Sequence, residues 1–223
     1  MYLHKIIYRA AVFGVLISLA STAYSDEHDS RDNDLELSLR TNVMLGDSLP
    51  ANDILGIGVI GRYHLTNGWF AGAAIDAYKY DYENAALFAG TVQDPDASEF
   101  DALASNTVVS GFIGRLYGKT NRGFDWFWSA GLGIGFPDID DFRGLTLAGE
   151  EFDLAFDAQT EIHVMGSFGT TYHFTPTWAA TFAARLEHHF MDVTSTDAVS
   201  GATSTLNSQS PFGAYISLDY RFK

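Results

Sequence analysis

The chain has 223 residues, no cysteine, 47% hydrophobic residues, 21 glycines and a formal net charge of −15. This length suits a single domain. The lack of cysteine excludes disulfides, thiolate metal sites and cysteine nucleophiles. The negative charge argues against nucleic acid as a partner, because phosphates require a concentrated basic patch.

Residues 1–25 are predicted to be a cleavable signal peptide. Lys5 and Arg9 supply positive charge, residues 10–20 form an apolar run, and Ala23 and Ser25 are the small residues before a cleavage site. The run is shorter than the roughly 20 residues of a membrane helix, and an N-terminal anchor helix is the alternative. We therefore expect export, with residues 26–223 as the mature domain and no later transmembrane helix.

From residue 34 onward, apolar residues recur with a period of two, which is typical of β-strands. In the clearest segment, Phe124, Trp126 and Leu132 share one face and glycines occupy half of the other. Most segments have about the 9–11 tilted residues that cross a bilayer. Eight strands are predicted, at residues 34–45, 54–65, 69–80, 106–117, 124–136, 157–173, 178–190 and 211–222.

The predicted connections alternate between short and long. The three short ones run from Leu65 to Trp69, from Gly118 to Gly123 and from Phe174 to Trp178, and they contain Asn-Gly, Asn or proline as turn residues. The longer ones cover residues 46–53, 81–105, 137–156 and 191–210, and we expect the Ser/Thr/Gly-rich part at 199–210 to be a mobile loop. This order predicts an all-β, eight-stranded antiparallel up-and-down barrel.

Alternation alone does not decide whether the apolar face lies inside a soluble barrel or outside a membrane barrel. Short turns at one end with long loops at the other, and an almost lysine-free polar face, favour the transmembrane form with short periplasmic turns and extracellular loops. Aromatic residues near the short-turn end are expected at the membrane interface. They are Tyr63, Trp69, Phe124, Tyr172, Trp178, Tyr220 and Phe222.

The segments Gly61–Trp69, Ala130–Phe136 and Ile216–Phe222 resemble the small eight-stranded outer-membrane barrels. This family contains outer membrane protein W and the transmembrane domain of outer membrane protein A. The resemblance implies location in a Gram-negative outer membrane, contact with lipid and lipopolysaccharide, and recognition of the last strand by the barrel-assembly machinery. Lys223 follows the aromatic Phe222, which departs from the family's aromatic ending.

Charged residues on the polar face are expected to point into the lumen, where buried charges need partners. Such a cluster is either a gate that sets selectivity or a salt-bridge plug, and we favour the plug. Its predicted members are Arg40, Arg62, Asp76, Arg115, Asp125, Arg185, Asp219 and Arg221.

Two His–carboxylate pairs are the most enzyme-like feature of the sequence. Pairing strands across residues 175–177 places Glu161 near His189 and His163 near Glu187. Such pairs suit a general base or a metal site. No serine stands beside them in the pattern, so we favour a structural hydrogen-bonded role and expect neither a resident metal nor a cofactor.

The sequence therefore predicts a non-enzymatic outer-membrane barrel, acting as a narrow channel for small or hydrophobic solutes or as a structural surface barrel. The segments 81–105 and 137–157 are strongly acidic. They suggest an alternative as a surface adhesion protein, with divalent cations bridging the acids to lipopolysaccharide, or a merely solvated surface. A lipid A-modifying enzyme is the third alternative.

Overall fold

The computed structural model describes residues 34–45, 54–82, 102–118, 123–146 and 148–222. The predicted signal peptide, most of the predicted loop at 81–105 and the turn at 119–122 lie outside these residues. The strands are β1 (Leu35–Leu45), β2 (Ile54–His64), β3 (Trp69–Tyr82), β4 (Ala102–Tyr117), β5 (Gly123–Ile139), β6 (Phe142–Leu145), β7 (Glu151–Ala158), β8 (Glu161–His173), β9 (Trp178–Asp197), β10 (Thr203–Gln209) and β11 (Phe212–Phe222).

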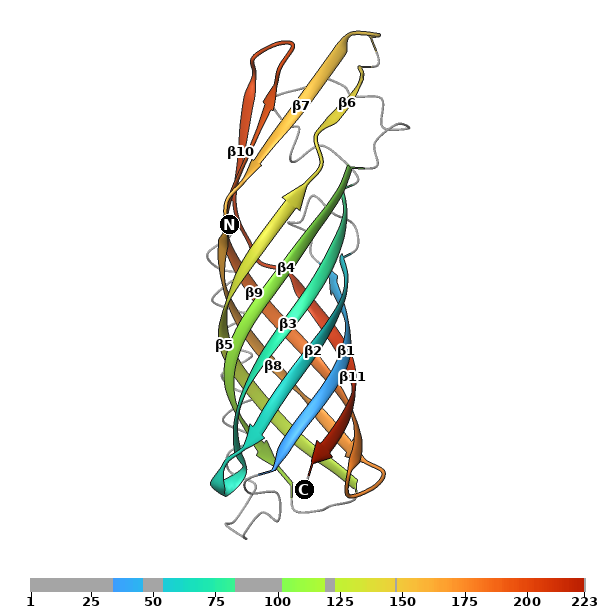
Figure 1. Ribbon diagram of the computed structural model, residues 1–223, viewed down its shortest axis with the longest axis vertical. Coiled ribbons are helices and arrows are strands. Elements are labelled where there is room, and N and C mark those ends of the chain that lie inside the picture. Colours follow the sequence, from blue (N-terminus) through green and yellow to red (C-terminus); the bar gives the residue numbers. More distant parts are fainter. Residues whose placement is uncertain (1–33, 46–53, 83–101, 119–122, 147, 223) are drawn as a thin grey trace.

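Eight of these strands close into one antiparallel barrel (Figure 1). In barrel order they are β1, β2, β3, β4, β5, β8, β9 and β11, and β11 pairs with β1 to complete the ring. The predicted meander is confirmed. No helical segment in the described part of the chain is long and apolar enough to span a membrane.

Closing the sheet staggers its strands, as a tilted barrel requires. Successive paired residues lead from Leu35 through Tyr63, Ala71, Ile113, Ala130, Gly166, Leu186 and Phe212 back to β1 at Leu45, ten residues further along. Eight strands leave an interior just wide enough for side chains. The residues that point inward therefore decide what the lumen holds.

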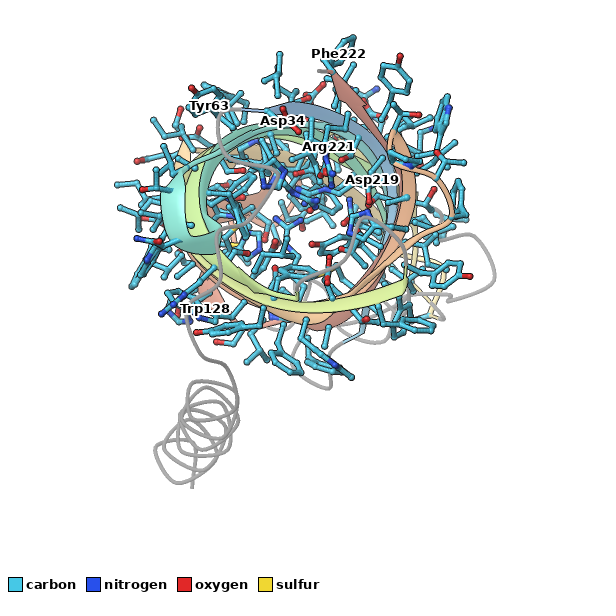
Figure 2. All side chains as sticks on the ribbon, turned by 90° about the horizontal axis from the view of Figure 1, so that it is seen from below. Asp34, Tyr63, Trp128, Asp219, Arg221 and Phe222 are labelled. Atoms are coloured by element: carbon cyan, nitrogen blue, oxygen red, sulfur yellow. The ribbon has the colours of Figure 1, made fainter. Side chains whose placement is uncertain are left out.

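The apolar face of the barrel points outward and the polar face points inward. Leu39 and Ile57 are both 64% exposed, whereas Asp76 and Arg185 are completely buried in the lumen. Seen along the axis, Asp219 and Arg221 lie inside the ring while Tyr63, Trp128 and Phe222 lie outside it (Figure 2). Apolar side chains on the outer wall suit contact with acyl chains. The membrane orientation of the pleat is confirmed, and the soluble alternative is wrong.

The short turns have the chemistry that the sequence predicts. Asn67 and Gly68 both adopt left-handed backbone angles, with φ of 61° and 74°, inside a single 3-10 turn, η1 (Thr66–Gly68). Asn and Gly are the residues that tolerate this conformation best. At the β8–β9 turn, the Thr175 side chain accepts hydrogen bonds from the backbone N–H groups of Thr177 and Trp178.

The long-loop end is more regular than predicted. Strands β5 and β9 continue past the predicted barrel ends, and β6, β7 and β10 extend the sheet above the barrel (Figure 1). The expected mobile loop at 199–210 contains β10, which pairs with β9. Runs of Thr and Ser have high enough β-propensity to continue a ladder once a partner strand is present, so the prediction of a loop there is wrong.

The predicted strand at 157–173 is interrupted by a bulge. Ala158 pairs with Val193, but Ile162 pairs with Phe190, so the β7–β8 side has one extra residue. Residues 159–161 stand opposite residues 191–192 of β9, and the Gln159 N–H donates to the Asp192 carbonyl. A bulge of this kind bends the strand and separates the barrel from its extracellular extension.

The predicted interface aromatics lie on the outer wall near the short turns, where their rings pack in pairs. Ring centroids are 4.9 Å apart for Trp178 and Tyr220, 4.8 Å for Phe124 and Tyr172, and 4.8 Å for Tyr220 and Phe222. Tyr63 is 44% exposed on the same wall. These positions fit an aromatic girdle at a membrane interface.

Candidate functional site: the charged lumen

The upper lumen holds a network of ion pairs centred on Asp76 of β3. Arg40 of β1 donates from Nε to Asp76 Oδ1 at 2.7 Å and pairs through Nη2 with the second carboxylate oxygen. Arg185 of β9 approaches that oxygen at 3.8 Å. Asn42 donates to Asp76 Oδ1 at 3.1 Å. Arg40, Asp76 and Arg185, predicted to lie together at mid-height, thus join three strands across the lumen.

Glycine at position 58 makes room for this network. Gly58 of β2 is the direct neighbour of Asp76. A Cβ atom at Gly58 would stand 2.0 Å from Asp76 Oδ1. A larger residue there would push the carboxylate away from both arginines.

The network continues from Arg185 towards the long-loop end. Arg185 pairs with Glu187 through Nε, and Glu187 Oε2 lies 2.8 Å from His189 Nε2. The other ring nitrogen of His189, Nδ1, lies 2.9 Å from Glu161 Oε1. Asn106 donates to the same oxygen at 2.6 Å. Charged and polar side chains from β1, β3, β4, β8 and β9 therefore form one connected set across the lumen.

The register of these residues differs from the prediction. His163 lies opposite His189, and Glu187 lies opposite Met165, two residues from the predicted pairing, although the β8–β9 turn is centred on Pro176 as the sequence predicted. Glu161 and His189 nevertheless make contact as diagonal neighbours. His163 Nδ1 is 4.0 Å from Glu187 Oε2, beyond hydrogen-bond distance.

A second charged layer lies near the short turns. Arg62 pairs with Glu36 at 2.7 Å, and Arg221 approaches the other Glu36 oxygen at 4.0 Å. His64 Nε2 lies 3.4 Å from that oxygen. Glu36 and His64 are absent from the predicted cluster, although their alternation with outward Leu35 and Tyr63 placed them on the inner face.

Asp125 and Asp219 belong to this lower layer but contact different groups. His173 Nε2 lies 2.8 Å from Asp125, while Asp219 accepts hydrogen bonds from Thr181 at 2.6 Å and Ser217 at 2.7 Å. Neither carboxylate is exposed by more than 1%. The lower cluster is therefore a set of local pairs.

Aromatic and small side chains lie among and between the two charged layers. Phe70, Leu116, Phe127 and Tyr215 form a buried apolar cluster inside the barrel, with Phe112 packed against it. Two small cavities in this region each have space for about one water molecule. Side chains thus occupy most of the cross-section at this level.

Arg115 does not belong to the lumen, and its prediction is wrong. It lies on the outer wall in line with Val109 and Ile113, and its guanidinium carbon is 5.8 Å from the centre of the Trp69 ring and 5.2 Å from that of Tyr117. Gly114-Arg115 repeats Gly61-Arg62 in sequence, but the two motifs have opposite phases of the pleat. At the interface a long arginine stacks on aromatic rings while its charge reaches the polar boundary.

A histidine–serine contact on the outer wall was missed by the sequence reasoning. His188 Nδ1 lies 2.7 Å from Ser210 Oγ, and the His188 ring packs on Phe190 with centroids 4.4 Å apart. Ser210 is 22 residues away in sequence and follows β10, so the pair depends on the unpredicted β9–β10 hairpin. No local pattern signals it.

The extracellular extension is acidic. Asp138, Asp140, Asp141, Glu150 and Glu151 are exposed on or beside β5–β7, and Arg143 pairs with Asp153 at 3.0 Å. Asp197 ends β9 and accepts hydrogen bonds from the Ser200 hydroxyl and from the N–H groups of Asp153, Val199 and Ser200. Burial acts to raise the pKa of Asp197, but these hydrogen bonds outweigh it and hold the pKa below its ordinary value.

Comparison with known proteins identifies the fold of this chain but not a family to which it belongs. No family model and no curated protein matches the sequence. Among solved structures, the outer membrane protein OprG from Pseudomonas aeruginosa is 12% identical with a TM-score of 0.59, covering 87% of this chain and 98% of its own. Neisserial surface protein A (NspA) is 12% identical with a TM-score of 0.50, covering 85% of this chain and 96% of its own. The chain therefore has the fold of small outer-membrane barrels.

Proposed function

We propose that this chain, with the fold of the small eight-stranded outer-membrane barrels, is a structural surface barrel closed by buried ion pairs. The observation that carries the proposal is the connected network from Arg40 through Asp76, Arg185 and Glu187 to His189. All five side chains are buried. A permeating ion would have to separate these pairs in a lumen that excludes bulk water, which costs several kcal/mol per charge.

Location in the outer membrane is part of the same proposal. It is supported by the apolar outer wall, by the predicted export signal at 1–25, and by the outward-facing aromatic Phe222 at the end of β11. Fractionation of cells that express the chain with and without residues 1–25 tests this. We expect heat-modifiable protein in the outer-membrane fraction with the segment, and protein retained in the cytoplasm without it.

Single-channel recording in planar bilayers tests the closed lumen. We expect no stable conductance steps from the purified, folded protein under conditions in which a known porin conducts. Reproducible steps that scale with salt concentration would reject the plug and support the narrow channel. Uptake of a hydrophobic solute into vesicles containing the barrel would instead support passage through the wall.

The acidic extension gives this barrel a surface on which partners can bind. Its exposed carboxylates match cationic partners or divalent ions shared with lipopolysaccharide. Vesicles of lipopolysaccharide should bind the extension more strongly with Mg²⁺ than with a chelator. The triple variant Asp138→Asn, Asp140→Asn, Asp141→Asn should lose that difference, and an unchanged response would leave only a solvated surface.

The His188–Ser210 contact supports one second candidate, hydrolysis of a lipid ester at the outer wall. A hydroxyl at 2.7 Å from an imidazole is the geometry of an activated nucleophile. Labelling with a fluorophosphonate serine probe, together with mass spectrometry of lipid A, tests it. Labelling that Ser210→Ala abolishes would favour the enzyme, whereas no labelling and an unchanged acyl pattern would leave the structural barrel.

A further inference from the structure

One of the two buried histidines of the upper lumen, His163, has no hydrogen-bond partner in the described part of the chain. His163 is completely buried, and neither of its ring nitrogens has a hydrogen-bond partner among the described residues. Buried polar groups are almost always satisfied. A pair of unsatisfied nitrogens in the His163 ring, beside two charged groups, therefore indicates that this ring binds a ligand.

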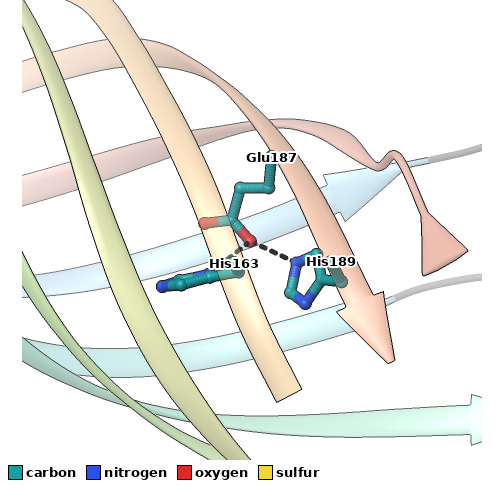
Figure 3. Close-up of side chains that lie close together, drawn as sticks. All are labelled: His163, Glu187 and His189. Carbon is teal, nitrogen blue, oxygen red and sulfur yellow. Dashed lines mark hydrogen bonds and ion pairs between the residues drawn. The ribbon is translucent and has the colours of Figure 1, made fainter. Parts of the chain in front are cut away.

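Two further metal-binding side chains face this ring. Donor atoms of His163, Glu187 and His189 all lie within 4.8 Å of one another (Figure 3). Two imidazole nitrogens and one carboxylate oxygen form a donor set that Zn²⁺ uses when three protein ligands leave a fourth position open. Within the described residues this is the one such group that the structure brings together.

Glycines on β5 form a cradle for these side chains. A Cβ atom at Gly133 would stand 1.8 Å from His163 Nε2, and one at Gly135 would stand 2.3 Å from Glu161 Oε1. The alternating glycines of this strand thus leave space for an imidazole and a carboxylate. Both glycines lie on the buried, lumen face of β5, so a side chain at either position would extend into the space that these groups occupy.

Glu161 holds His189 in the orientation that a metal ligand needs. Its Oε1 atom lies 2.9 Å from Nδ1 of His189, which leaves Nε2 facing Glu187. A carboxylate on the far nitrogen of a ligating histidine fixes the ring and increases its basicity. Asn106 in turn donates to Glu161 at 2.6 Å.

The charge of the network leaves a place for a cation. The connected upper set contains the carboxylates Asp76, Glu161 and Glu187 but only the guanidinium groups of Arg40 and Arg185. In the metal-free set His189 contacts a carboxylate through each ring nitrogen, so its ring carries the balancing positive charge. A divalent ion at His163, Glu187 and His189 would take the place of the proton on Nε2 of His189 and supply positive charge where the carboxylates gather.

We propose that His163, Glu187 and His189 bind a divalent transition-metal ion, Zn²⁺ in the first place, with Glu161 positioning His189. Such an ion would join β8 and β9 at the upper end of the lumen. The site goes beyond the structural role proposed above and does not depend on whether the barrel conducts. It also replaces the sequence-based view of these residues as purely structural pairs.

Calorimetric titration of the folded mature protein, without a polyhistidine tag and after treatment with a chelator, tests the site. We expect one Zn²⁺ per chain. His163→Ala and His189→Ala should each weaken binding by about 100-fold or more, and Glu161→Gln by about 10- to 100-fold. The matched control is His188→Ala, which removes a neighbouring histidine on the outer wall and should bind as the parent does.

A second measurement needs no variant and covers the case in which a lumen substitution prevents folding. X-ray absorption of the Zn²⁺-loaded parent protein should show two imidazoles in the first coordination shell. An all-oxygen shell, no stoichiometric binding, or binding that persists in folded His163→Ala and His189→Ala would overturn the proposal. The first and last of these would place the ion on the acidic extension.

Discussion

Removing Asp76 provides the sharpest test of a closed lumen. Asp76 is the carboxylate on which Arg40 and Arg185 converge, and Arg40 has no other carboxylate within ion-pair distance among the described residues. In a dry lumen, Asp76→Ala leaves a buried guanidinium without its partner, at a cost of about 3–5 kcal/mol in the free energy of unfolding. In a water-filled lumen the same pair is worth only about 0–1 kcal/mol.

The two cases predict different free energies of unfolding. These can be measured by reversible urea unfolding in lipid vesicles or detergent, monitored by tryptophan fluorescence. We expect Asp76→Asn to lose less than Asp76→Ala, because the amide oxygen still accepts a hydrogen bond. A double-mutant cycle with Arg40→Met should give a coupling energy towards the upper end of about 0.5–3 kcal/mol. Asp138→Ala, on the exposed extension, is the matched control and should stay within about 0.5 kcal/mol of the parent.

A loss of about 1 kcal/mol or less for Asp76→Ala, with negligible coupling to Arg40, would refute the reasoning. It would mean that water screens the network. The barrel would then need to be regarded as a hydrated narrow channel.

Three further predictions concern other parts of the chain. Gly133→Ala should lower the free energy of unfolding by about 1–3 kcal/mol in urea titrations, because the added Cβ collides with the His163 ring. Gly61→Ala is the control and should be near neutral, because its added Cβ has no atom within 4 Å. Equal effects of the two substitutions would contradict the proposal that Gly133 makes space for His163. Arg115→Ala should lower the free energy of unfolding by only about 0.5–2 kcal/mol in the same assay, because it removes cation–π contacts on the outer wall. A loss as large as that of Asp76→Ala would indicate that Arg115 lies in the lumen after all. The folded pKa of Asp197 lies below its ordinary value of 3.8, so its stabilisation of the β9–β10 turn is present above that value and is lost as the pH falls through the folded pKa. Hydrogen exchange in that turn should therefore accelerate on acidification while the barrel stays protected. Asp197→Asn should abolish this pH dependence.

The sequence by itself determined the number of barrel strands, their approximate bounds and the face that meets lipid. These features depend on local chemistry. Period-two alternation is visible within each strand, and Asn67-Gly68 and Pro176 mark the turns wherever the strands lie in space. The outward position of Arg115 could also have been predicted from the sequence, since Arg115 has the same parity in its strand as the exposed Val109 and Ile113. The repeated Gly-Arg motif misdirected that assignment.

Only the tertiary structure decided which lumen groups meet. The contacts of Asp76 with Arg40 and Arg185, and of Glu36 with Arg62 and Arg221, join strands whose relative heights depend on barrel stagger. A shift of register by two residues keeps every side chain on its face but changes all of its neighbours. By contrast, the position of His163 opposite His189 follows from a turn centred on Pro176, so this pair could have been derived from the sequence. The extracellular strands are likewise stabilised by pairing with β9, and this long-range pairing is invisible to local propensity.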